Sequence, residues 1–238
     1  MRYRALATDY DGTIATDGSL TPDTIAALGR LRESGRKAIM VTGRELTKLM
    51  RVCPRTDLFD LIIAENGAVL YDPATREEQV LGHPPPASLV AELRARGVAP
   101  LEVGRVIVAT LTTQEATVRS TLDRLGLDRT IILNKGSVMV LPRNVDKATG
   151  LAAALDRLGL PPESVVGVGD AENDHAFLKE CGCAVAVANA LPTLQQQVDW
   201  VTSYDHGAGV IELIDRLIAT DDCGAPQSDE SPAQISRK

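Results

Sequence analysis

The chain has 238 residues, a formal net charge of −7 and an isoelectric point near 5.1. This length is enough for one large hydrophobic core or for two smaller ones. The acidic balance argues against broad electrostatic binding to nucleic acid or to an anionic membrane. No apolar run approaches the roughly 20 residues of a membrane helix, and no signal peptide precedes the first predicted strand, so we expect a cytoplasmic protein. The composition indicates no particular oligomeric state.

The first predicted strand, over residues 3–7, leads directly into a pair of carboxylates. The strand is apolar apart from Arg4, and Asp9-Tyr10-Asp11-Gly12-Thr13 follows it. Burying Asp9 or Asp11 without a partner would be costly, so a cation should lie beside them. Mg²⁺ is the natural candidate, because it binds one or two carboxylates together with a substrate phosphate.

A hydroxyl group and a glycine follow the second predicted strand. Thr21-Pro22-Asp23 predicts the start of a helix that ends at Gly35, and an apolar strand follows at 38–41. Thr42-Gly43-Arg44 then precedes a helical pattern that begins at Leu46. A hydroxyl and free backbone N–H groups at a helix start form an anion-binding site.

The middle of the chain predicts a separate small unit. His83-Pro84-Pro85-Pro86 is stiff and extended, and Pro142-Arg143-Asn144 is a second break. Between them we predict a helix, a strand, a second helix and a β-hairpin, over residues 87–96, 105–110, 113–125, 130–133 and 138–141. This is too much structure for a loop and too little for a free-standing domain, so residues 83–143 are predicted to form an αβαββ cap.

The segments on either side of the cap predict one core domain, over residues 1–82 and 144–219. Lys147 opens a helix, and a strand at 165–168 ends in Gly169-Asp170-Ala171-Glu172-Asn173-Asp174. Further strands are predicted at 61–64, 184–187 and 200–202. Alternating strands and helices predict an α/β fold with a Rossmann-like, doubly wound parallel sheet. Ligands of such sheets bind beyond the carboxyl ends of the strands, where the strand order reverses.

The four cysteines show no zinc-binding pattern, and the last residues show no periodicity. Cys181-Gly182-Cys183 lacks a histidine or a second cysteine pair at zinc spacing, so we interpret it as small buried residues before a strand. A reducing cytoplasm is the default compartment. The polar tail over residues 220–238 is expected to be disordered.

Four motifs in this order resemble the haloacid dehalogenase superfamily, in its Mg²⁺-dependent phosphatase branch. They are the DxDGT sequence from Asp9, Thr42 after an apolar strand, Lys147, and the GDxxND sequence from Gly169. The resemblance extends from Tyr3 to about Leu217. The sequences at 65–68 (ENGA) and 187–190 (VANA) are similar to the Cof-like, type IIB subgroup, in which a cap is inserted between the Thr and Lys motifs.

The resemblance implies a role for each motif residue. Asp9 would attack phosphorus and form an aspartyl-phosphate, while Asp11 would act as general acid and then as general base. Mg²⁺ would be held by Asp9, the backbone carbonyl of Asp11, and Asp170. The phosphoryl oxygens would be held by Thr42, the Gly43 N–H and Lys147. Asp174 would orient Lys147 or a metal-bound water, and Asn173 fits a contact to phosphate or to these groups somewhat better than a helix cap.

Several polar residues have two interpretations from sequence. Substrate contact and an ordinary solvated or turn role fit Arg44, Glu65 and Asn66 equally well. Residues in or beside the cap would select the leaving group or lie on the surface, namely His83, Asn134, Lys135 and Arg143. His175 fits a helix surface better than catalysis.

The expected function is hydrolysis of a small phosphorylated metabolite, such as a sugar phosphate or phosphoglycolate. A phosphomutase is the alternative, because a related capped branch of the superfamily uses the same paired Asp motif. A non-catalytic nucleotide-binding module fits less well. Gly167 and Gly169 begin a GxGxxG pattern, but Glu172 occupies the third glycine position and would repel a pyrophosphate.

Overall fold

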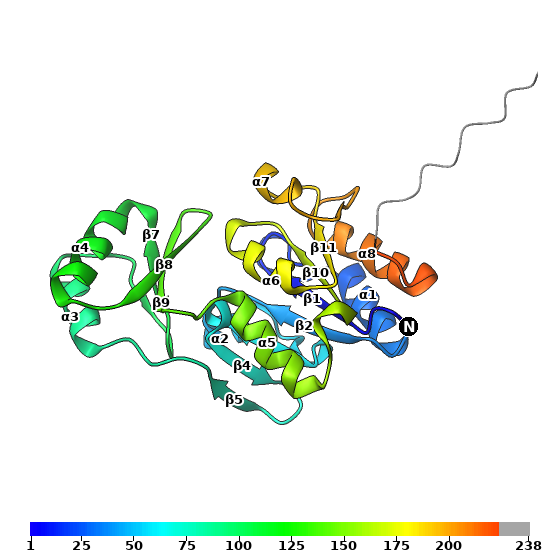
Figure 1. The fold of residues 1–238 in the computed structure, drawn as a ribbon, viewed down its shortest axis with the longest axis horizontal. Coiled ribbons are helices and arrows are strands. Elements are labelled where there is room, and N and C mark those ends of the chain that lie inside the picture. Colours follow the sequence, from blue (N-terminus) through cyan, green and yellow to red (C-terminus); the bar gives the residue numbers. More distant parts are fainter. Residues whose placement is uncertain (224–238) are drawn as a thin grey trace, which may run out of the picture.

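Two β-sheets organise residues 1–223, the part of the chain that this computed structural model describes (Figure 1). The larger sheet has the strand order β12-β11-β10-β1-β2-β3-β4-β5. Its strands span Ala5–Asp9 (β1), Lys37–Val41 (β2), Leu61–Ala64 (β3), Val69–Asp72 (β4), Glu77–Val80 (β5), Val165–Gly169 (β10), Cys183–Ala186 (β11) and Trp200–Val201 (β12). The six strands from β12 to β3 are parallel, which confirms the predicted fold class. The antiparallel pairs β3–β4 and β4–β5 were not predicted.

In the described part of the chain, eight α-helices pack against the two sheets, and the helices that begin at Pro22 and Lys147 have side-chain caps. The helices span Pro22–Glu33 (α1), Leu46–Val52 (α2), Ala87–Ala95 (α3), Glu115–Leu125 (α4), Lys147–Leu158 (α5), His175–Glu180 (α6), Pro192–Gln195 (α7) and His206–Thr220 (α8). The Thr21 hydroxyl accepts the Thr24 N–H at 3.2 Å, and Pro22 fills the first turn of α1, as predicted. Helix α1 packs beside α8 and α5 beside α6, and all four helices contribute to one large core. Within residues 1–223, no helix is long and apolar enough to cross a membrane.

The strand order of the larger sheet reverses at β1. After β1 the chain adds β2 and β3 on one side, and it later returns to place β10 on the other side of β1. The carboxyl ends of β1 and β10 are therefore neighbours at the point where ligands bind in such sheets. Asp9 ends β1 and Asp170 follows β10, so the fold itself brings two of the predicted motifs together.

The second sheet has four antiparallel strands in the order β6-β7-β9-β8, and it lies to one side of the larger sheet (Figure 1). Its strands span Glu102–Val103 (β6), Val108–Leu111 (β7), Arg129–Asn134 (β8) and Ser137–Pro142 (β9). Residues of α3 and α4 share a small core with this sheet, including Leu93 and Leu122. The order is αββαββ, so the predicted αβαββ order is wrong by one strand. The missed strand, β6, has only two residues, both exposed, and carries no hydrophobic alternation.

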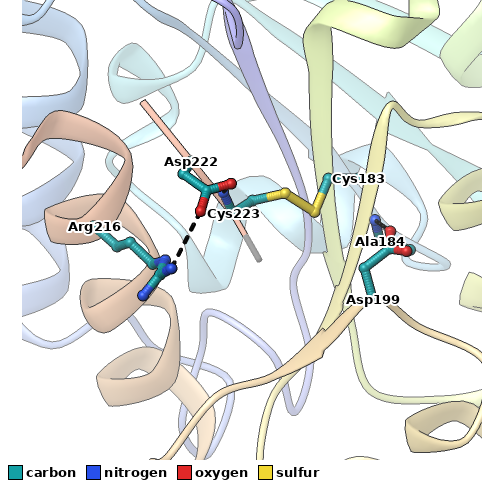
Figure 2. The surroundings of a disulfide bond; sticks show 6 residues. All are labelled: Cys183, Ala184, Asp199, Arg216, Asp222 and Cys223. Carbon is teal, nitrogen blue, oxygen red and sulfur yellow. Dashed lines mark hydrogen bonds and ion pairs between the residues drawn. A yellow bond between two sulfur atoms is a disulfide. The ribbon is translucent and has the colours of Figure 1, made fainter. Parts of the chain in front are cut away.

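The chain remains attached to the core beyond α8. The Asp221 carboxylate accepts hydrogen bonds from Arg36 Nη2 at 2.8 Å and from the Tyr3 N–H at 3.3 Å. Cys223 is buried and forms a disulfide with Cys183 (Figure 2). The prediction of a disordered tail from residue 220 is therefore wrong for residues 220–223, and its remainder, 224–238, lies outside the described residues.

The disulfide joins the start of β11 to the segment that follows α8. Cys183 is the first residue of β11 and is buried as predicted, whereas Gly182 is exposed, so the prediction of three buried residues is wrong there. The disulfide partner of Cys183 lies 40 residues further along the chain. No local sequence pattern predicts a disulfide between residues so far apart, and a reducing compartment does not favour one. Cys53 and Cys181 are free thiols, and burial raises the pKa of Cys181 to about 12.

We expect dithiothreitol to lower the unfolding free energy of the oxidised protein by up to about 4 kcal/mol, because the bond closes a loop of 40 residues. Urea unfolding with and without reductant measures this change. Cys223→Ser should begin at the lower stability and show no response to the reductant. An equal response of the variant and the wild type would contradict the pairing.

Candidate active site

The two carboxylates after β1 have different surroundings. Asp9 is 5% exposed, and its Oδ1 accepts a hydrogen bond from Lys147 Nζ at 2.5 Å. The Asp11 side chain is 44% exposed and forms a two-point ion pair with Arg44, with both N–O distances at 2.6 Å. Asp9 is thus buried beside a cation, and Asp11 faces open space with its orientation fixed. This division suits one carboxylate that acts as a nucleophile and a second that exchanges protons.

Asp9 also belongs to a compact cluster of three buried carboxylates. Asp9, Asp170 and Asp174 each offer one oxygen within 4.8 Å of the others. Lys147 Nζ lies 2.5 Å from both Asp9 and Asp174, while Thr13 Oγ1 donates to Asp170 at 3.0 Å. A donor set made only of carboxylate oxygens fits a hard divalent cation and not a zinc-type site. The Asp11 side chain lies outside this cluster, and its predicted metal contact through the backbone carbonyl stays a prediction.

The charges of the cluster depend on one another. Burial raises the pKa of Asp9 well above its usual value, and Asp174 raises it further while Lys147 opposes both effects. Burial lowers the pKa of Lys147, but Asp174 and Asp9 outweigh burial and the net pKa is raised. Burial likewise raises the pKa of Asp170, against the effect of the neighbouring Lys135. The cluster is therefore short of positive charge, which a bound dication would supply.

Gly12 allows the two strand ends to approach each other. It has φ of +86°, and a Cβ at this position would lie 2.3 Å from an Asp170 carboxylate oxygen. Two residues that sequence reasoning did not assign hold its carbonyl oxygen, which accepts from Asn189 Nδ2 and lies 2.8 Å from His206 Nδ1. For Asn189, the only sequence feature that could have predicted this contact is its place in the VANA sequence. No sequence feature predicts the contact of His206, because it lies 194 residues from Gly12.

Asp174 and Asn173 occupy different places although they are adjacent in sequence. Asp174 Oδ2 accepts the N–H groups of Asp170 and Ala171 at 2.8 and 2.9 Å, and its other oxygen contacts Lys147. It therefore has the contact that its predicted role requires. Asn173 Nδ2 donates to Asn66 Oδ1 at 2.8 Å, and both residues line a second cavity. The same Nδ2 would lie 3.8 Å from a Cβ on Gly43, in the predicted anion-binding loop. A phosphate contact by Asn173 stays a prediction.

Thr42 and Gly43 lie where the anion-binding loop was predicted. Thr42 is buried at the end of β2, and its Oγ1 accepts the Arg44 N–H at 3.1 Å. Gly43 and Arg44 line the same cavity as Asp9 and Asp11. The structure thus brings the loop after β2 to the paired carboxylates.

Glu65 does not line this cavity, and its carboxylate binds the backbone of the second sheet. It is fully buried, and its carboxylate accepts the backbone N–H groups of Arg105, Val106 and Ile107 at 2.8, 2.9 and 3.0 Å. Its own N–H donates to the carbonyl of Arg44 at 2.9 Å. Glu65 therefore links the Thr42–Arg44 loop to the turn between β6 and β7. The left-handed backbone at this position, with φ of +52°, is one that a non-glycine residue keeps only where its surroundings require it.

We expect Glu65→Ala to lower the unfolding free energy by about 3 kcal/mol, because it leaves three N–H groups in a partly buried turn without their acceptor. Urea unfolding measures the loss. Glu115→Ala removes a partly exposed carboxylate from α4 that is paired only with the exposed Arg119, and it should stay within about 0.5 kcal/mol of the wild type. Equal stabilities of the two variants would show that the Glu65 contacts carry no stability.

The tip of the β8–β9 hairpin faces the paired carboxylates across a cavity of about 340 Å³. Residues of both sheets line it, namely Asp9, Asp11, Gly43, Arg44, Glu45, Lys48, Glu102, Ala109, Asn134, Lys135, Ser137 and Met139. The lining distinguishes cap residues that could contact the leaving group from cap residues that lie on the surface. Asn134 and Lys135 reach the cavity, whereas Arg143 is exposed and pairs with Asp128 at 2.6 Å, and His83 is exposed.

A carboxylate pair, a buried lysine and a hydroxyl-bearing loop at the switch point of a doubly wound sheet form the layout of a phosphoryl-transfer enzyme. The chain belongs to the haloacid dehalogenase-like hydrolase family, whose model matches residues 6–93 and 102–214. The predicted family and the predicted enzyme class, a phosphatase, are confirmed.

Individual relatives agree with this family over nearly the whole chain. A phosphoglycolate phosphatase from Methanothermobacter thermautotrophicus is 33% identical over 225 residues, which cover 90% of this chain and 99% of the relative. A haloacid dehalogenase-like hydrolase from Bacteroides thetaiotaomicron has a TM-score of 0.76 at 20% identity and covers 90% of this chain and 99% of its own. A subclass IIB sugar phosphatase has a TM-score of 0.72 at 18% identity, with coverages of 90% and 97%. The two structures share the fold of this chain.

Proposed function

We propose that this phosphatase hydrolyses a small phosphorylated acid such as 2-phosphoglycolate, through an aspartyl-phosphate on Asp9. The observation that carries the proposal is the cavity of about 340 Å³, which is lined by Asp9 and Asp11 of the core and by residues of the β8–β9 hairpin. This volume is near the lower end for ligand sites and suits a compact substrate. The relative named phosphoglycolate phosphatase, matched over 99% of its length, supports the choice of acid.

We further propose Mg²⁺ as the cofactor, held by Asp9, Asp170 and the backbone carbonyl of Asp11. The all-oxygen donor set and the shortage of positive charge in the cluster support this choice. When bound, Mg²⁺ would reduce the repulsion between the Asp9 carboxylate and the phosphate and would stabilise transition-state charge.

The residues of the chain would carry out two half-reactions. In the first, an Asp9 oxygen bonds to phosphorus, the bond from phosphorus to the leaving oxygen breaks, and Asp11 gives that oxygen a proton. In the second, Asp11 takes a proton from water, which attacks the phosphorus and releases inorganic phosphate and free Asp9. Lys147, Thr42 and the Gly43 N–H would hold the phosphoryl oxygens, and the contact of Lys147 with Asp9 supports this assignment.

The glycines that suggested a nucleotide-binding module have a packing role in this fold. A Cβ on Gly167 would lie 2.8 Å from side-chain atoms of Cys181 and Leu178, and one on Gly169 would lie 2.7 Å from Asp174. Both positions lie in β10 under α6 and need close approach, which accounts for glycine without a phosphate ligand.

The cytoplasmic location and the domain boundaries at 82/83 and 143/144 stay predictions.

Isotope labelling separates hydrolysis from the mutase alternative. With 2-phosphoglycolate in H₂¹⁸O, we expect equal amounts of glycolate and inorganic phosphate, with the label in the phosphate, because water attacks the phosphorus of the aspartyl-phosphate. Mass spectrometry of the released phosphate measures this. Accumulation of an isomeric sugar phosphate without phosphate release, stimulated by a bisphosphorylated sugar, would instead support a phosphomutase.

A further inference from the structure

Lys135 reaches from the cap into the acidic cluster. It lies in the turn between β8 and β9 with φ of +41°, and its Nζ contacts Asp170 Oδ2. The Lys135 side chain is 41% exposed, whereas the Asp170 side chain is fully buried. The same ammonium lies 2.8 Å from the position that a Cβ on Gly12 would take. A long cap side chain thus crosses the cavity and ends beside the predicted nucleophile loop.

This contact occupies a carboxylate that the proposed cation also needs. Lys135 Nζ and a divalent ion repel each other and would compete for the same Asp170 oxygen. Lys147 stays with Asp9 and Asp174 and is fully buried, so Lys135 is the cation of the cluster that has room to withdraw. Binding of a dication would therefore displace the Lys135 ammonium from Asp170 and leave it free in the cavity.

Within residues 1–223, four carboxylates line the cavity, namely Asp9, Asp11, Glu45 and Glu102, and all but Glu45 already have a cationic partner. Asp11 pairs with Arg44, and Glu102 pairs with Lys48 at 2.5 Å. A displaced Lys135 would lie on the cap side of the cavity, opposite Asp9, which is the side where a leaving group extends from the phosphoryl group. An anionic leaving group would give this ammonium a new counter-ion, and a neutral one would not.

We propose that Lys135 is a specificity-determining residue that binds the carboxylate of the leaving group once a divalent cation has displaced it from Asp170. The inference rests on the proposed function and assigns it a substrate class: phosphate monoesters of short hydroxy acids. It also gives the order of events, because the lysine becomes available to substrate only in the metal-loaded enzyme.

The test compares two esters that differ in the group that Lys135 would bind. 2-Phosphoglycolate carries a carboxylate where 2-hydroxyethyl phosphate carries an uncharged hydroxymethyl group. We expect Lys135→Gln to lower the ratio of kcat/KM for the acid to kcat/KM for the neutral ester by roughly 10- to 100-fold. Lys135→Arg keeps the charge and should restore much of the ratio. The control Arg119→Gln, which removes an exposed cation from α4, should leave the ratio unchanged.

Calorimetric titration with Mg²⁺ in the absence of substrate gives a second measurement. Lys135→Gln should bind Mg²⁺ severalfold more tightly than the wild type, because the competing ammonium is gone. An unchanged ester ratio, or Mg²⁺ binding that is equal or weaker in the variant, would overturn the proposal.

A wild-type enzyme that releases phosphate from sugar phosphates and not from 2-phosphoglycolate would refute the proposed substrate. A wild type that hydrolyses 2-phosphoglycolate while the variant keeps its ratio would refute only the role of Lys135.

Discussion

Replacement of Asp9 by asparagine should lower kcat/KM by about 10³-fold or more, because a neutral amide cannot form the acyl-phosphate. The change preserves the shape of the side chain, and its amide oxygen can still accept from Lys147 Nζ, which keeps a second counter-ion in Asp174. The fold should therefore persist, and the loss should appear in kcat.

Steady-state kinetics with a good substrate, together with thermal unfolding, measure both effects. The matched control is Asp23→Asn, which makes the same chemical change on the exposed first turn of α1 and should leave kcat/KM unaffected. An Asp9→Asn preparation, free of wild-type enzyme, with activity within tenfold of the wild type would remove Asp9 from the nucleophile role.

Removal of divalent cations should abolish turnover, and added Mg²⁺ should restore it. Without a dication, Asp9, Asp170 and Asp174 have only lysine ammonium groups as cationic partners in the structure, and the approach of a phosphate to Asp9 is opposed by like charge. Phosphate release in excess EDTA, followed by addition of Mg²⁺, measures this dependence.

Ca²⁺ should inhibit the Mg²⁺-loaded enzyme. Its larger coordination shell allows the nucleophilic carboxylate to bind through both oxygens, which directs Asp9 away from phosphorus. Inhibition should be reversed by excess Mg²⁺. Undiminished turnover in EDTA would exclude the metal assignment, whatever the effect of Ca²⁺.

The sequence by itself determined the elements that carry the motifs. Strands β1, β2 and β10 are short, mostly apolar runs with a polar residue at or directly after their carboxyl ends, and the start of α1 has a threonine cap and a proline. These signals lie within a few residues of the feature that they predict. Because parallel strands place their carboxyl ends on one edge, the convergence of Asp9, Thr42 and Asp170 also followed from the sequence.

Contacts between distant residues were decided only by the tertiary structure. The disulfide joins Cys183 to Cys223, Glu65 binds a turn that lies 40 residues away, and Lys135 contacts Asp170 across the cavity. Each side chain also has an ordinary role at its own position in the chain, such as a small buried residue, a turn residue or a surface cation. Which role it takes depends on what the fold places beside it, because the energies of burial and of charge pairing are set by neighbours in space. The motifs therefore identified the chemistry of the phosphoryl group. Only the placement of the cap over the core distinguished Asn134 and Lys135, which line the cavity, from the other candidate cap residues.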